Sequence, residues 1–443
     1  MAKRKGKRSA PYDPFTALRL ICLTPDLEPL AHTLYEQALQ GSKPLWGDMN
    51  PELLRNDPKF RGEFLRLSHA GMKKAQEGLI ELVSSNENLT DSQSALLYGI
   101  ADAIAWQLLG NQLCYARRYY KWHDPVDLKS SNFESVVIAA NSFMDKDEGG
   151  FALISDLTSF IQVGDLLAIG SAGGLHTIEV KEGRKNHDIM EFMNFFMESG
   201  CPQAFQFFAK EHGESGVKQL QRMFRQVERM GHVTEIMSTG RSEDPDTQQK
   251  IHIPEDTYYL GDWTEKLVSV LEKSDERGWA IDVVDECLYI GSYASDSMRN
   301  SGHAAFNLWF DEMGGTPECP RFRLIECMKH PLAPPIFTWA VSDKHKFDIL
   351  FGRKNVCLGL NVSAFIEKLK KEGLSVREAT NREASMLDQR GMPPYRHLGK
   401  VILVSDGDRE VALNDGVFLR VLFHRQNPVE TVKVILGIPF EEE

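Results

Sequence analysis

Apolar side chains recur at helical spacing through the N-terminal part of the chain, most regularly between Ala70 and Leu82. Shortly after this run, Thr90 and Gln93 have the spacing of a capping box, in which each side chain bonds the backbone of the other residue. A further helix is therefore expected to begin there. These patterns predict a disordered basic tail at residues 1–14 and a helical region over residues 15–131.

The hydrophobic period changes after residue 131. One more helical stretch is followed by three short runs rich in strand-forming residues, and helical spacing then resumes. The expected helix runs from Asn132 to Met144, the expected strands are Phe151 to Gln162, Gly164 to Gly170 and Leu175 to Glu182, and the later helices are Asp188 to Phe208 and Gly216 to Met230. This order predicts an α/β core over residues 132–237.

A polar, proline-bearing segment follows at residues 238–256, and its composition is typical of a linker between domains. Beyond it, helical and strand patterns alternate. Helices are expected from Trp263 to Leu271 and Ser363 to Lys371, and strands at Trp279 to Tyr293, Ile336 to Val341, Val401 to Val404, Val411 to Phe423 and Thr431 to Leu436. The chain is thus expected to be an α/β protein with a helical N-terminal region, the central core, and a separate mixed α/β accessory domain over residues 257–443.

Composition and charge limit the kinds of partner and the cellular compartment that are expected for this protein. The chain of 443 residues has a formal net charge of −12, so contact with nucleic acid must be made by a local basic surface. Its seven cysteines are scattered singly, without the CxxC spacing of a zinc site, which favours a reducing cytoplasm over a disulfide-forming compartment. No apolar run reaches the length of a membrane span, and no secretory signal is recognisable, so a cytoplasmic protein without membrane contact is expected.

Two of the expected strands place acidic and basic side chains close together. Asp165 opens one strand, while Glu179 and Lys181 lie two residues apart on the next, in the only Glu-x-Lys of the chain. Because side chains alternate along a strand, Asp165 shares their face only if it pairs with residue 179 or 181. That register requires an odd number of turn residues or a bulge, and Gly173 and Gly174 can adopt the positive φ angles of such a turn. Pairing with the intervening residue would separate the three side chains.

The residue types on this hairpin match the chemistry of phosphodiester hydrolysis. Hard cations such as Mg²⁺ prefer oxygen ligands, so Asp165, Glu179 and the backbone carbonyl of Val180 are candidate ligands. A bound Mg²⁺, or Mn²⁺ in its place, would activate a water molecule and neutralise charge on the phosphate. Lys181 is the candidate for orienting this water or stabilising the developing negative charge. Two further acids precede the hairpin and are candidates for an additional metal contact: Glu134 and Asp156.

A strand that ends in Glu-x-Lys is also common as a solvated face with cross-strand ion pairs, so the context must decide. Residues 132–230 carry Asp165, Glu179 and Lys181 on a helix, three strands and a helix, and in this they resemble the PD-(D/E)XK, or restriction-endonuclease-like, nuclease superfamily. Gly164 stands where a proline often precedes the aspartate. The resemblance implies an αβββα core and a Mg²⁺-dependent DNA endonuclease, as in microbial restriction or anti-phage defence proteins.

The last expected helix of this core carries a basic stripe. Lys218, Arg222, Arg225 and Arg229 recur at intervals that place them on one helical face. Further hydrogen-bonding side chains lie beside them: Gln219, Gln221 and Gln226. A solvated surface helix would show the same pattern. On an acidic protein, directly after a candidate metal site, contact with nucleic-acid phosphates is the favoured interpretation.

Other segments allow alternatives. Residues 115–122 mix aromatic and basic side chains, as platforms for single-stranded nucleic acid do, although aromatic residues at the end of a helix mainly pack in the core. A non-catalytic module of the same fold, binding nucleic acid or protein within a larger complex, is the rival to a nuclease. An oligomeric scaffold with a vestigial site is a third alternative. Because an unregulated nuclease is toxic, control by a partner protein or by homo-oligomer assembly is expected, with residues 257–443 the candidate partner-binding region.

Overall fold

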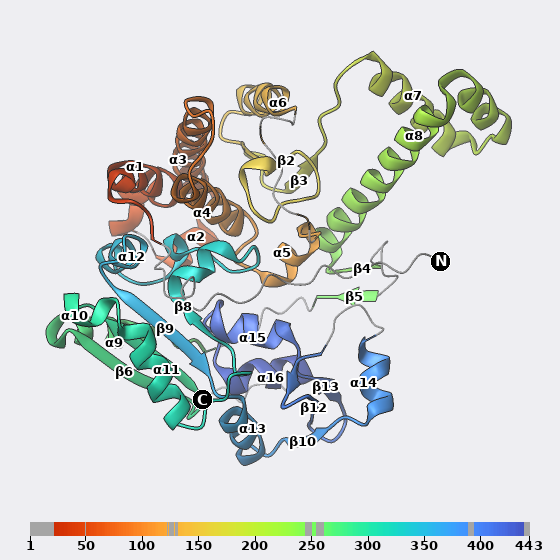
Figure 1. The fold of residues 1–443 in the computed structure, drawn as a ribbon. Helices are drawn as coiled ribbons and strands as arrows, with labels where there is room; N and C mark the ends of the chain where they lie inside the picture. Colours follow the sequence, from red (N-terminus) through yellow and green to blue (C-terminus); the bar gives the residue numbers. More distant parts are fainter. Residues whose placement is uncertain are drawn as a thin grey trace.

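The chain adopts a mixed α/β fold with a helical N-terminal region and several small antiparallel sheets (Figure 1). This computed structural model describes residues 22–48, 50–121, 123, 128, 132–243, 250–253, 261–388 and 394–437. The predicted tail at 1–14 lies outside these residues, and so does much of the predicted linker at 238–256. Within the described residues, no helix combines the length and the apolar content that a membrane crossing requires.

The N-terminal region is helical, as its apolar spacing predicts. Its helices are α1 (Glu28–Gln40), α2 (Pro51–Asn56), α3 (Pro58–Ser84), α4 (Asp91–Leu108) and α5 (Leu113–Tyr119). The predicted capping box is present at the start of α4: the Thr90 hydroxyl accepts from the Gln93 N–H, and the Gln93 side chain accepts from the Thr90 N–H. Most residues in the middle of α4 are buried, so this helix passes through the core rather than over the surface.

The central segment has the predicted order of helix, three strands and helices. Its elements are α6 (Phe133–Lys146), β1 (Phe151–Ile154), β2 (Leu166–Ile169), β3 (Leu175–Ile178), α7 (Arg184–Ser199) and α8 (Pro202–Thr239). The strands form an antiparallel sheet with β2 in the middle.

Several boundaries in this segment differ from the sequence prediction. The third strand ends at Ile178 rather than Glu182, so Glu179 and Lys181 follow the strand instead of lying on it. The last helix runs from Pro202 to Thr239 and includes the predicted stretch from Gly216 to Met230. The first strand is shorter than Phe151 to Gln162, because Ser155–Leu157 form a 3₁₀ turn closed by the Thr158 hydroxyl, which donates to the Ser155 carbonyl. The single helix predicted from Asp188 to Phe208 is two helices. Gly200 takes a left-handed conformation with φ 58°, and Pro202 starts the next helix.

Residues beyond 260 build the remaining sheets, with β4 (Arg241–Glu243) and β5 (Lys250–His252) pairing just before them. One four-stranded antiparallel sheet has the order β6-β7-β9-β8, and another has β12 at its centre, paired with β10, β11 and β13. The strands are β6 (Trp279–Val284), β7 (Leu288–Tyr293), β8 (Arg321–Arg323), β9 (Asn355–Leu360), β10 (Ser375–Glu378), β11 (Arg396–His397), β12 (Lys400–Ser405) and β13 (Glu410–Ala412). The helices are α9 (Thr264–Arg277), α10 (Asp296–Arg299), α11 (Gly302–Glu312), α12 (Asp343–Leu350), α13 (Val362–Lys371), α14 (Asn381–Asp388), α15 (Asp415–Leu422) and α16 (Pro428–Leu436).

Three strand predictions in this region were wrong. Ile336–Thr338 is a 3₁₀ turn, most of the stretch from Val411 to Phe423 is α15, and the stretch from Thr431 to Leu436 belongs to α16. These stretches are rich in apolar and β-branched residues, which favour strands in isolation. Local capping overrides that preference in α15, because the Asn414 side chain accepts from the Gly416 N–H, and in α16, which begins at a proline.

One cluster of buried apolar residues runs through the N-terminal helices, the three-stranded sheet and the C-terminal sheets. Contacts between α1 and the neighbourhood of α12 strengthen this junction: Arg353 bonds both oxygens of Glu28, and the Tyr35 hydroxyl donates to Asp343 at 2.5 Å. The division into domains stays a prediction. By contrast, α7 and the first half of α8 extend away from the body and have a small core of their own, formed by Ile189, Met193, Phe208, Leu220 and Met223 (Figure 1).

Candidate active site

The turn of the β2–β3 hairpin has the odd length that the sequence prediction requires. Ile169 pairs with Leu175, so the turn contains residues 170–174, and regular pairing ends at Leu166 and Ile178. Asp165 lies just beyond the last regular pair, and its N–H donates to the Ile178 carbonyl at 2.8 Å. The predicted positive φ angles are present in the turn, at 85° for Gly173 and 90° for Gly174. Asp165 and Glu179 both lie at this end of the hairpin, and both line the cavity described below.

Glycine at position 164 lets the chain enter β2 at this point. Gly164 has φ 77°, and a Cβ there would lie 2.3 Å from the Thr177 methyl carbon. Both the backbone conformation and the close approach of β3 exclude a larger residue. The turn delivers Asp165 to the end of the hairpin, where its Oδ2 accepts from the Val180 N–H at 2.6 Å. Val180 thus contacts the site through its backbone N–H.

The Asp165 carboxyl lies in an unfavourable place for a negative charge. Burial, followed by the neighbouring charge of Glu179, raises the pKa of Asp165 to about 6, although the Val180 N–H and Lys181 act in the opposite direction. Asp156 adds a smaller effect that also raises this pKa. A cation bound between the carboxylates would relieve their repulsion, because it would favour the charged form of each.

Glu179 and Lys181 are held by a third residue, Gln226 of α8. The Lys181 ammonium lies 2.5 Å from Glu179 Oε1 and donates to Gln226 Oε1 at 3.0 Å, while Gln226 Nε2 donates to Glu179 Oε1 at 2.9 Å. Both charged side chains are largely buried, with 16% of each exposed. The contacts among Glu179, Lys181 and Gln226 hold the end of the hairpin against α8. The carboxylates of Asp165 and Glu179 therefore lie next to the side of α8 that carries Gln226.

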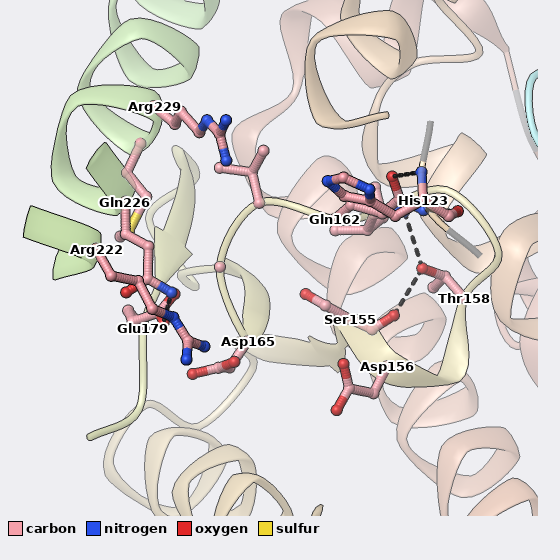
Figure 2. A pocket seen from close by; sticks show the side chains of 14 residues that line it. His123, Ser155, Asp156, Thr158, Gln162, Asp165, Glu179, Arg222, Gln226 and Arg229 are labelled. Atoms are coloured by element: carbon pink, nitrogen blue, oxygen red, sulfur yellow. Dashed lines mark hydrogen bonds between the residues drawn. The ribbon is translucent and has the colours of Figure 1, made fainter. Parts of the chain in front are cut away.

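A cavity of about 260 Å³ lies between the hairpin and α8 (Figure 2). Asp165 and Glu179 line it from the hairpin, and Arg222, Gln226 and Arg229 line it from α8. The side of the cavity opposite α8 is formed by the segment after β1, with Ser155, Asp156, Thr158 and Gln162, and by His123, which lies beyond the end of α5. Carboxylates and guanidinium groups thus face the same space.

Only two of the four residues in the predicted basic stripe on α8 line the cavity. Arg222 and Arg229 line the cavity, whereas Lys218 is exposed and pairs with Glu214 at 2.7 Å on the same helix. Arg225 is also exposed, and its Nε donates to the Gln221 carbonyl. Only part of one helical face can turn toward the hairpin, so the structure brings two of the four basic residues to the carboxylates.

The two additional acids differ in their placement. Asp156 lines the cavity from the 3₁₀ turn after β1. Glu134 lies in the first turn of α6, is exposed, and is not among the residues that line the cavity. The structure therefore brings Asp156, and not Glu134, to Asp165 and Glu179.

The aromatic and basic segment at 115–122 serves mainly as structure in its described part. Tyr119 is buried, and its hydroxyl is 3.1 Å from that of Thr177 on β3. Beyond α5, Gln162 accepts from the Lys121 N–H at 2.7 Å and donates to the His123 carbonyl at 2.7 Å. These bonds fix the end of α5 at the edge of the cavity, a role that the sequence did not reveal.

Oxygen donors in the cavity fit a divalent cation such as Mg²⁺. The carboxylates of Asp156, Asp165 and Glu179 all line it, and the buried hydroxyl of Ser155 has no hydrogen-bond partner among the residues that the structure describes. A second group able to hold a metal, formed by His187, Asp188 and Glu191, lies on the surface of α7 outside the cavity. An exposed acidic group of this kind is common on helices that bind no metal.

Comparison of the chain with protein-family models, with curated proteins and with solved structures finds no significant match.

Proposed function

We propose that the protein is a metal-dependent nuclease whose active site is the cavity between the β2–β3 hairpin and α8. The observation that carries this proposal is that Asp165 and Glu179, at the end of the hairpin, line one cavity together with two arginines of α8. Two carboxylates for a cation and two guanidinium groups for a phosphate are the groups that phosphodiester hydrolysis needs in one place.

Each side of the cavity has its own task in this proposal. Asp165 and Glu179 hold Mg²⁺, for which Mn²⁺ can substitute, and Asp156 completes the set of acidic ligands. A bound Mg²⁺ supplies charge neutralisation and a water of lowered pKa. Lys181, fixed by Glu179 and Gln226, keeps an ammonium beside the reacting phosphate.

The arginines on α8 give the substrate its position. Arg222 and Arg229 bind phosphate oxygens on both sides of the bond to be cleaved, because planar guanidinium groups suit phosphate geometry. We propose DNA as the substrate and endonucleolytic cleavage as the reaction. The restriction-endonuclease-like αβββα assignment and the setting in restriction or anti-phage defence in the cytoplasm are parts of the same proposal. They rest on the resemblance of residues 132–230 to that superfamily.

One contact favours a second candidate, a non-catalytic binding module of the same fold. Glu179 and Lys181 neutralise each other at 2.5 Å, as a purely structural ion pair would. In that case Arg222 and Arg229 would still bind nucleic acid, and the carboxylates would serve only to hold the hairpin. The two candidates differ in whether the carboxylates are needed for turnover.

Cleavage of supercoiled plasmid in Mg²⁺ or Mn²⁺ tests the proposal. Wild type should cleave, and Asp165→Asn, Glu179→Gln and Lys181→Met should each lower the rate at least about 100-fold. Asp188→Asn removes a similar charge from the exposed surface of α7 and should cleave like wild type. Equal cleavage by all variants would refute the site. Plasmid binding without cleavage by wild type in either metal would favour the binding module.

A further inference from the structure

Two arginines lie near each other where α5 packs beside the start of α15, and neither has an acidic ion-pair partner among the described residues. The guanidinium of Arg117 lies against Gly416, because a Cβ at position 416 would be 2.8 Å from its Nη2 and 3.0 Å from its Nη1. Arg420 follows Gly416 by four residues and so lies one turn further on the same face of α15. We call this place the arginine recess, formed by Arg117, Arg420 and the first turn of α15.

Neither guanidinium in the recess has a hydrogen bond or ion pair within the described part of the chain. Some arginines elsewhere in the protein have two acidic partners each. Arg353 binds Glu28 and Asp348, and Arg377 binds Glu383 and Glu410. A half-buried arginine loses hydration, and this loss is normally offset by a carboxylate or carbonyl partner. The recess does not supply one to Arg117 or Arg420.

The electrostatics show that the recess has an excess of positive charge. Burial, together with the charges of Arg420 and Arg118, lowers the pKa of Arg117 to about 10, and burial also lowers the pKa of Arg420. Asp415 opposes the effect on Arg117, but its side chain is exposed and forms no ion pair with either arginine in the described structure. The N–H groups at the start of α15 add partial positive charge at the same point.

We propose that the arginine recess binds the phosphate group of a small phosphorylated molecule, such as a nucleotide. Planar guanidinium groups bind phosphate oxygens in pairs, and the partial positive charge at a helix start favours a nearby anion. A small ligand fits better than a polymer backbone, because Arg117 and Arg420 are half-buried between two segments of the chain. On α8, in contrast, Arg222 is exposed, as a contact to a long phosphate chain requires.

This site does not depend on the proposed nuclease activity, so it can be tested by binding alone. Inorganic phosphate, pyrophosphate and AMP are titrated into the full chain, and the melting temperature and heat of binding are recorded. At least one of these probes should raise the melting temperature saturably in wild type. Arg117→Gln and Arg420→Gln should each weaken that binding at least about tenfold. Arg382→Gln, at an exposed position on α14, is the matched control and should bind like wild type.

The variants also separate binding from a structural role. Without ligand, Arg117→Gln and Arg420→Gln should melt at or above the wild-type temperature, because each removes a repelling charge. A lower melting temperature together with unchanged binding of the probes would overturn the proposal. It would equally be overturned if none of the probes bound wild type. A third result would also overturn it. If Arg117→Gln weakened the binding of a single-stranded oligonucleotide without terminal phosphates but not the binding of pyrophosphate, the arginine recess would be a contact to the nucleic-acid backbone.

Discussion

The hairpin cavity and the arginine recess both gather charged side chains, but they differ in the signs of the charges that they bring together. In the cavity, carboxylates on the hairpin face arginines on α8 across a shared space. In the recess, Arg117 and Arg420 meet at a helix start, with Asp415 exposed beside them. A cavity with both signs can take a cation and a phosphate together, as hydrolysis requires, whereas a recess with one sign can take an anion and hold it. On this difference we base the proposals of hydrolysis at the first and of anion binding at the second.

The largest effect is expected from a change that disturbs the position of the Asp165 carboxylate. Gly164→Ala adds a methyl group 2.3 Å from Thr177 in a residue with positive φ, and it should lower the free energy of unfolding by about 2 kcal/mol or more. Gly200 is in the left-handed helical conformation, with φ 58° and ψ 20°, and a Cβ there would meet no atom within 4 Å. Gly200→Ala should therefore lose only the part due to backbone strain, about 1 kcal/mol. Urea unfolding of the two variants measures the difference, and equal losses would show that the approach of β3 does not fix Asp165.

A second test measures the negative charge of the cavity directly. The pKa of Asp165 is raised from 3.8 to about 6, so between these pH values the unfolded chain releases its proton first and the folded state is penalised. As the pH rises from 4 to 6, wild type should lose stability relative to Asp165→Asn, by at most about 3 kcal/mol. Thermal unfolding across this range measures the gap. The raised pKa of Asp102 affects both proteins and cancels in the comparison. A gap that stays constant with pH would show that Asp165 is not perturbed.

The smallest expected effect distinguishes the two sides of α8. Arg222 lines the cavity and Arg225 points elsewhere, although both belong to the same basic stripe in the sequence. Arg222→Gln should weaken binding of a DNA duplex about tenfold, whereas Arg225→Gln should change it less than about threefold. Fluorescence anisotropy at fixed salt gives both values. If the two variants lose affinity equally, the whole stripe contacts nucleic acid and the cavity has no special role in binding.

Local patterns predicted the hairpin well, and for a physical reason. Strand alternation and the parity of the turn are properties of a few neighbouring residues, so the odd turn of the hairpin follows from the sequence. The capping box at Thr90 and Gln93 is equally local. The contact between Gln226 and Glu179 is not, because it depends on how α8 packs against β3. Sequence spacing showed a polar residue at position 226 without its direction.

The C-terminal region shows the opposite case. Buried runs with β-branched residues, such as Val417 to Val421 in α15 and Val429 to Val432 in α16, suit a strand or a buried helix equally well. Caps decide between the two states, and here Asn414 and Pro428 select helices. The arginine recess was beyond sequence reasoning altogether. Arg117 and Gly416 lie far apart in the sequence, and no periodicity connects them.

Calorimetric titration with Mn²⁺ measures directly whether Asp165 and Glu179 form a metal site. It compares wild type with the double variant Asp165→Asn/Glu179→Gln and with Asp188→Asn/Glu191→Gln, which removes the acids of the exposed group on α7. We expect wild type and the α7 variant to bind Mn²⁺ with the same affinity, and the hairpin variant to bind it at least about tenfold more weakly. Equal binding by wild type and the hairpin variant, or loss of binding in the α7 variant alone, would contradict a metal site between Asp165 and Glu179.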